Sequence, residues 1–147
     1  MNVSSNLGYA VEVPKVPAAR LVYSGNLAIL VRNLTRNTVL ADHADVADTS
    51  AKRRTGLLKH TVLATGEGLW IAPCEGVHSF FMKFTIDVLY LDSKLKVRKL
   101  RPHMAPWRIS LCLPADSVLE LPAGAIAATH TERGDQLEIE KLSSPSG

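Results

Sequence analysis

The chain has 147 residues, of which 46% are hydrophobic and 21% are charged, so it is expected to fold and is not disordered along its whole length. No stretch approaches the roughly 20 consecutive apolar residues of a membrane-spanning helix, and two cysteines are too few for a disulfide scaffold. The formal net charge of +3 is only mildly basic and indicates no class of partner by itself.

The composition divides the chain into three parts. Residues 1–25 mix Gly, Ser and Asn with two prolines and are expected to form a flexible lead. Residues 26–142 are predicted to form a single β-rich domain, followed by a disordered tail over 143–147. No basic segment followed by an apolar one occurs at the start, which predicts a cytoplasmic protein, or an exported one if a signal has been removed.

Apolar and alternating segments predict most of the secondary structure. Strands are expected over 26–31 and 38–47, and the side-chain oxygens of residues 48–50 favour a helix start there, with the helix running over 50–60. Further strands are predicted over 69–72, 86–91, 95–101, 118–121 and 136–140, with a short helix over 123–130. Many short strands, two short helices and no repeat predict an α+β fold, mainly β, with a small antiparallel, barrel-like sheet.

A distinctive stretch, HSFFMKFTIDVLYLD over residues 78–92, lies between several shorter motifs. These are RTGL at 54–57, GLW at 68–70, PW at 106–107, LELPAG at 119–124 and GDQL at 134–137. In this order, over roughly residues 37–139, they resemble the bacterial and archaeal family known as domain of unknown function 192. The resemblance implies a small β-rich fold and, in many members, export, but no particular activity.

Polar groups of several kinds interrupt the apolar stretch over residues 78–87, a composition that suits a concave pocket with a few convergent polar groups. The expected pocket residues are His78, Lys83, Asp87, Trp107, Arg108 and Glu120, with Phe81 and Met82 as walls. Alternatively, Lys83 pairs with Asp87, His78 caps a turn, and Trp107 anchors a sheet edge.

We expect a non-catalytic binding or accessory module, monomeric and without a cofactor, that takes a small anionic or sugar-like ligand or a partner peptide. One alternative is a small hydrolase with Ser79 or Cys74 as nucleophile and His78 as base. Adjacent strand residues point to opposite faces, which works against the pairing of Ser79 with His78.

A second alternative is nucleic-acid binding through the basic residues of segment 94–101, since residues 93–115 contain no acidic side chain. We favour the simpler explanation, a solvated edge strand that uses lysine and arginine to block aggregation, and expect no nucleic-acid partner.

A metal site would have to use Cys74, His78, His103 and Cys112. Cysteine and histidine suit zinc, but this spacing matches no standard zinc finger. We therefore expect no metal, and two reduced cysteines buried as small apolar groups.

Overall fold

The structure, a computed structural model, describes residues 28–142. The predicted flexible lead and disordered tail lie outside these residues. No helix among them is long and apolar enough to cross a membrane.

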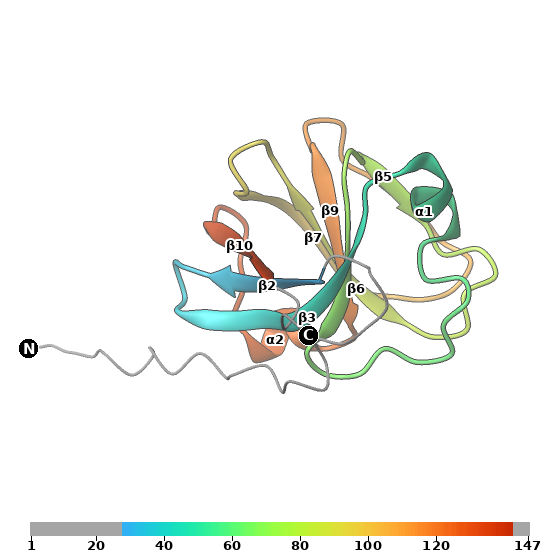
Figure 1. The fold of residues 1–147 in the computed structure, drawn as a ribbon, viewed down its shortest axis with the longest axis horizontal. Coiled ribbons are helices and arrows are strands. Elements are labelled where there is room, and N and C mark those ends of the chain that lie inside the picture. Colours follow the sequence, from blue (N-terminus) through green and yellow to red (C-terminus); the bar gives the residue numbers. More distant parts are fainter. Residues whose placement is uncertain (1–27, 143–147) are drawn as a thin grey trace, which may run out of the picture.

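Strands outnumber helices in the described residues, and seven of them form one curled sheet (Figure 1). In spatial order these are β10 (Leu137–Leu142), β2 (Ala28–Asn33), β3 (Thr38–Ala47), β4 (Glu67–Ile71), β9 (Ser117–Pro122), β6 (Ile86–Leu91) and β7 (Val97–Met104). A separate two-stranded sheet pairs β5 (Gly76–His78) with β8 (Ile109–Leu111). The two helices are α1 (Ser50–Thr55) and α2 (Ala125–Ala128).

The α+β class, mainly β with two short helices, is confirmed, but the sheet is mixed rather than wholly antiparallel. Strands β3 and β4 run parallel, because the chain crosses over through α1 between them. The sheet is also not closed into a barrel. Its two ends meet around the bridge between Lys96 and Gln136, where the Val97 N–H donates to the Asp135 carbonyl and the Leu137 N–H donates to the Leu95 carbonyl.

Helix α1 is shorter than the predicted 50–60. It begins as expected, because the Thr49 hydroxyl accepts a hydrogen bond from the Lys52 N–H at 3.2 Å. It ends at Thr55, because Gly56 adopts φ +48° and donates its N–H to the Lys52 carbonyl. The chain therefore leaves the helix one residue before Leu57 and buries that side chain.

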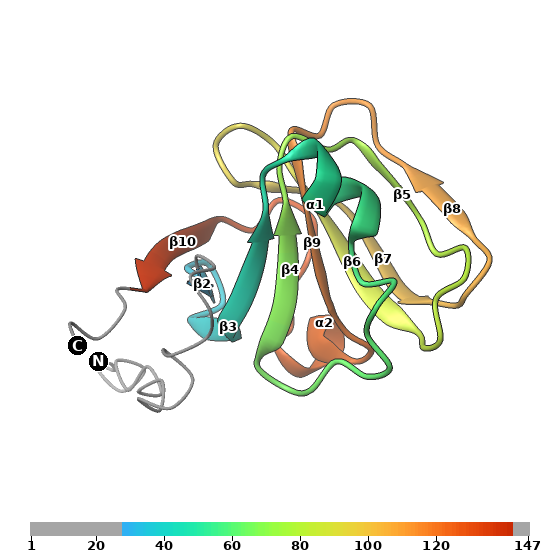
Figure 2. The same cartoon turned by 45° about the vertical axis from the view of Figure 1, so that its right-hand side comes forward.

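The central strands are covered on both faces, because their side chains alternate between two core clusters. On β6, Leu89 and Leu91 belong to the first cluster, with strands β2, β3 and β10. Val88 and Tyr90 belong to the second, with β4 and residues near β5 and β8. The β5–β8 pair covers this second cluster and lies at the end of the molecule farthest from β10 (Figure 2).

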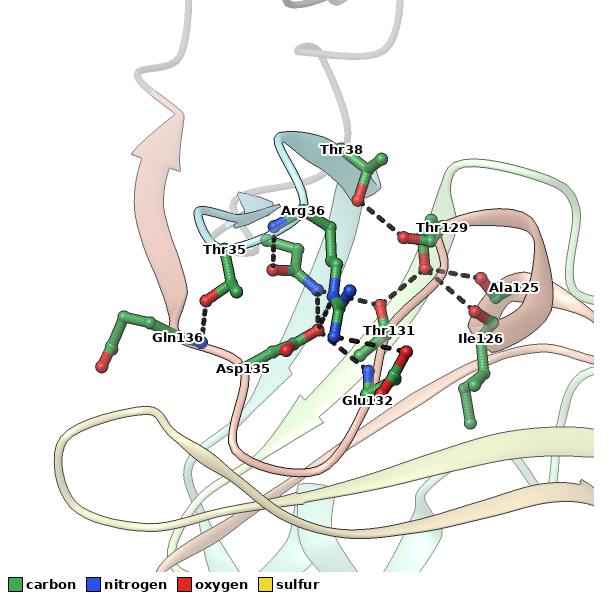
Figure 3. Close-up of polar contacts among 11 residues, drawn as sticks. Thr35, Arg36, Thr38, Ala125, Ile126, Thr129, Thr131, Glu132, Asp135 and Gln136 are labelled. Carbon is green, nitrogen blue, oxygen red and sulfur yellow. Dashed lines mark hydrogen bonds and ion pairs between the residues drawn. The ribbon is translucent and has the colours of Figure 1, made fainter.

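A buried polar network ties β2 to the turn before β10 (Figure 3). The Asp135 Oδ2 atom accepts hydrogen bonds from Asn33 Nδ2 at 3.0 Å, Arg36 Nε at 3.0 Å and the Glu132 N–H at 2.9 Å. Asn33 Nδ2 also donates to the Thr131 hydroxyl at 3.1 Å. The Oδ2 atom of the buried carboxylate and the Asn33 amide nitrogen are thus engaged by residues of the fold itself, so the network holds this corner of the sheet.

Candidate functional site

A cleft of about 820 Å³ opens between α1 and β5, and strands β4 and β9 contribute to its floor. This volume lies within the range of about 300–1,000 Å³ that is typical of ligand pockets. Its apolar lining comes from Leu57, Leu58, Ile71, Val77 and Met82. Its polar and charged lining includes Arg53, Arg54, Glu75, His78 and Glu120. Apolar walls with a few charged groups suit a ligand that has both an apolar and a polar part.

Glu120 is the most unusual of these residues. It lies on β9 between Leu119 and Leu121, which pack into the first core cluster, so its own side chain points to the other face and toward the cleft. The residue is only 4% exposed, and its Oε1 atom has no hydrogen-bond partner within residues 28–142. Burial raises the pKa of this carboxyl to about 7, so either protonation state is accessible near neutral pH.

Two further ionisable groups lie within electrostatic reach of Glu120. The Cys74 thiol donates a hydrogen bond to the Gly76 carbonyl at 3.1 Å, and burial raises its pKa, with the Glu120 charge adding to that shift. Burial also raises the pKa of Tyr90, and the Ser110 hydroxyl opposes that shift. Both groups are neutral at pH 7, so neither neutralises an ionised Glu120.

The structure brings four of the eight expected pocket residues together in this cleft: His78, Phe81, Met82 and Glu120. Trp107 lies beside them rather than in the lining, with its ring centroid 4.7 Å from that of Phe81 and with half of its surface exposed. The cleft therefore has an exposed aromatic rim.

The other expected residues serve the fold or face solvent. Asp87 is fully buried and accepts hydrogen bonds from the His103 N–H at 2.9 Å and the Ile126 N–H at 2.8 Å. Its carboxylate thus fixes the start of α2 and the end of β7, away from the cleft. Lys83 and Arg108 are exposed and outside the lining, and the Arg108 guanidinium bonds to the Trp107 carbonyl at 3.2 Å.

The groups proposed for hydrolysis are not arranged for it. The Ser79 hydroxyl is buried, donates to the Ala105 carbonyl at 2.6 Å and accepts from the Arg108 N–H at 2.9 Å. The His78 Nδ1 atom instead accepts from the Phe80 N–H at 3.3 Å. The raised pKa of Cys74 leaves little thiolate at neutral pH. No nucleophile–base pair forms among these three residues.

The considered metal ligands are also not assembled. Within the described part of the chain, no group of three or more His, Cys, Asp or Glu side chains is placed to hold a metal ion. Cys74 and Cys112 are free thiols, both half-buried. The four residues Cys74, His78, His103 and Cys112 therefore do not form a ligand set in this fold.

The basic segment 94–101 forms the turn before β7 and much of that strand, at the end of the main sheet. Arg98 lies 3.8 Å from Asp92, and Lys99 Nζ donates to the Leu111 carbonyl at 2.7 Å. The Lys99 ammonium also lies over the Tyr90 ring, 5.5 Å from its centroid. Part of the positive charge of this segment is thus engaged within the chain.

The cleft wall formed by residues 53–58 was not among the expected pocket residues. The signal in the sequence for this wall was the family motif RTGL at 54–57. The motif lies outside the predicted core strands, so a place in a core strand does not account for it. The family DUF192, described as an uncharacterized ACR, matches residues 31–139. The chain belongs to this family.

Relatives with similar sequences are archaeal. A UPF0127 protein of Thermococcus sibiricus is 33% identical over 114 residues, which cover 74% of this chain and 73% of the relative. A UPF0127 protein of Pyrococcus furiosus is 32% identical over 119 residues, or 75% of this chain and 97% of the relative.

Two bacterial proteins share the fold of this family member. A crystal structure described as a putative transcription regulator from Sinorhizobium meliloti has a TM-score of 0.68 at 20% identity, covering 80% of this chain and 95% of that one. A protein of unknown function from Novosphingobium aromaticivorans has the same TM-score and identity, with 92% and 99% coverage. At this identity the likeness concerns the fold alone.

Proposed function

We propose that the protein is a non-catalytic binding module that holds its ligand in the cleft between α1 and β5. The observation that supports this proposal is the Glu120 carboxyl, which is buried at the cleft and leaves one oxygen without a partner. An unpartnered buried carboxyl costs stability, so its retention is typical of a group that meets its partner in a ligand.

The chemistry of the cleft favours some of the expected ligand classes over others. A carboxyl at the cleft accepts hydrogen bonds from hydroxyl or amine groups, while Leu57, Leu58 and Met82 offer apolar surface to the rest of the ligand. A small anion would approach a group that is partly ionised at neutral pH. A sugar-like ligand or a partner peptide therefore fits better than a small anion.

The proposal is tested by titrating the ¹⁵N-labelled protein with monosaccharides, disaccharides, alkylamines and short blocked peptides. Binding is expected to shift the amide resonances of Val77, Met82 and Glu120 and to raise the melting temperature. Glu120→Leu, which removes the acceptor at similar size, is expected to weaken any such binding by about tenfold or more. The matched control is Glu138→Leu on β10, since Glu138 is an exposed carboxylate outside the cleft.

Two outcomes would contradict the proposal. One is the absence of any shift at cleft residues with all four ligand classes. The other is binding that the Glu120→Leu and Glu138→Leu variants affect equally. Low-salt retention on DNA or RNA that is lost in Arg98→Ala and Arg101→Ala variants would instead support the basic segment as the binding surface.

A further inference from the structure

We propose that the cleft binds an extended peptide segment, which pairs with the free edge of β5 as a third strand and directs a lysine or arginine side chain to Glu120. This inference rests on the proposed function, because it names the occupant of the same cleft.

The hydrogen bonding between β5 and β8 shows which backbone groups of β5 are free. The Cys112 N–H donates to the Glu75 carbonyl at 2.8 Å, and the Ser79 N–H donates to the Arg108 carbonyl at 2.9 Å. In an antiparallel ladder, hydrogen-bonded residue pairs alternate with pairs that are not hydrogen-bonded. The bonded pair between the two just described is therefore the one formed by Val77 and its register partner on β8. The backbone groups of the two intervening residues on β5 therefore point away from β8.

Those intervening residues are Gly76 and His78, and both line the cleft. The Gly76 carbonyl accepts the Cys74 thiol. No hydrogen bond within the described ranges engages the Gly76 N–H, the His78 N–H or the His78 carbonyl. An unpaired strand edge beside a cleft is the arrangement to which extended peptides add by main-chain pairing.

The register of such an added strand determines where its side chains point. The two peptide residues opposite Gly76 and His78 form the hydrogen bonds, and their side chains lie on the outer face of the small sheet. The residue between them lies opposite Val77, whose side chain packs against the second core cluster. Its side chain points the same way, into the cleft and toward Glu120.

The charges around Glu120 favour a cation at that central position. The ionisable groups within reach of the Glu120 carboxyl are Cys74 and Tyr90, and both are neutral at pH 7. On the α1 wall, the Arg53 guanidinium is held by the Asp48 carbonyl at 3.1 Å and by Ser50 Oγ at 3.3 Å.

The remaining charged or titratable lining groups are Arg54, Glu75 and His78, and all three are exposed. A lysine or arginine of the peptide supplies the partner that the buried carboxyl lacks, and its approach favours the ionised form of that carboxyl.

The decisive experiment compares blocked pentapeptides that have valine on each side of a central residue. A central lysine is expected to bind at least tenfold more tightly than norleucine, its uncharged analogue. Glu120→Gln is expected to remove this difference. Calorimetry at pH 7 in two buffers of different ionisation enthalpy should show release of up to about half a proton with the lysine peptide and none with norleucine.

Backbone methylation of the peptide tests the pairing without altering the protein. N-methylation of either valine next to the central lysine removes an N–H that faces β5 and should reduce affinity at least tenfold. N-methylation of the central lysine alters an N–H that faces away and should change affinity less than threefold. Equal losses at all three positions would overturn the strand pairing.

Two variants at one position provide the matched protein test. His78→Pro removes the N–H at the free edge of β5 but no hydrogen bond to β8. Strands tolerate proline at such an edge position, because its missing N–H is not needed for pairing within the sheet. His78→Ala removes the same imidazole and keeps the N–H. His78→Ala thus measures the loss of the imidazole alone, and peptide affinity should be at least tenfold lower in His78→Pro than in His78→Ala, with the melting temperature reporting on folding. Binding of sugars or amines but not of any peptide would overturn this inference and leave the proposed function standing, whereas no ligand at all would overturn both.

Discussion

Two of the deeply buried carboxylates in residues 28–142, those of Asp135 and Glu120, lie in opposite electrostatic environments. Asp135 is 3% exposed and Glu120 is 4% exposed. Burial works against the charge of Asp135, but hydrogen bonds from Arg36, Asn33 and the Glu132 N–H outweigh it and lower its pKa. Glu120 has only the effect of burial, which raises its pKa to about 7. The comparison indicates that Asp135 stabilises the fold, whereas Glu120 is kept at a cost to stability.

The largest effect is expected from breaking the network. Asp135→Ala should reduce the free energy of unfolding by about 3–5 kcal/mol, because donors from Asn33, Arg36 and the Glu132 N–H lose their shared acceptor, at about 1–2 kcal/mol each. Asp135 contributes its full stabilisation above about pH 3.8, which is the pKa of an exposed aspartate. This stabilisation is lost as the pH falls through the lowered pKa of Asp135 in the folded protein. Urea denaturation between pH 2 and 7 measures both effects, and a loss below 1 kcal/mol at pH 7 would contradict this assignment.

The opposite dependence is expected at Glu120. The folded protein holds a proton that the unfolded chain releases between pH 4.5 and about 7, so the free energy of unfolding should fall across this window by about 3 kcal/mol and then level off. Glu120→Gln should match the wild type near pH 4.5 and be more stable by a similar amount above pH 7. Thermal melts of the wild type and of Glu120→Gln across this pH range measure the difference in stability. If the variant is less stable than the wild type at every pH, Glu120 has a structural partner in the fold.

The smallest effect is expected at the rim of the network. The Glu132 carboxylate lies 3.3 Å from Arg36 Nη2 but is 68% exposed, so Glu132→Ala should change stability by only about 0–0.5 kcal/mol. Its backbone N–H, which bonds Asp135, is unaffected by the substitution. A loss as large as that of Asp135→Ala would mean that the network depends on its exposed charge rather than on its buried carboxylate.

Most of the main sheet was predictable, because its strands are long enough to show a pattern. The prediction over 38–47 matches β3, and that over 86–91 matches β6. Strands β5 and β8 have three residues each, too few to show alternation. The parallel pairing of β3 with β4 depends on the crossover through α1, which no local pattern specifies.

The cleft was predicted only in part, for a related reason. His78, Phe81 and Met82 belong to one continuous stretch whose mixed composition marks it, and Glu120 stands out as a charge between two leucines. Asp87 belongs to the same stretch, but its partners are N–H groups 16 and 39 residues away in sequence. Contacts at that separation arise from the tertiary fold, so the sequence did not distinguish a structural carboxylate from a ligand-binding one.

The pairing of β10 with β2 has a consequence for protein engineering. Ala28 and Leu142 are direct partners in the antiparallel register of β2 and β10, and β10 lies at the end of the molecule away from β5 and β8 (Figure 2). The polypeptide thus enters and leaves the described fold at one place. A short linker joining these positions, with new termini at the exposed 93–94 turn, should yield a circular permutant that keeps the cleft intact.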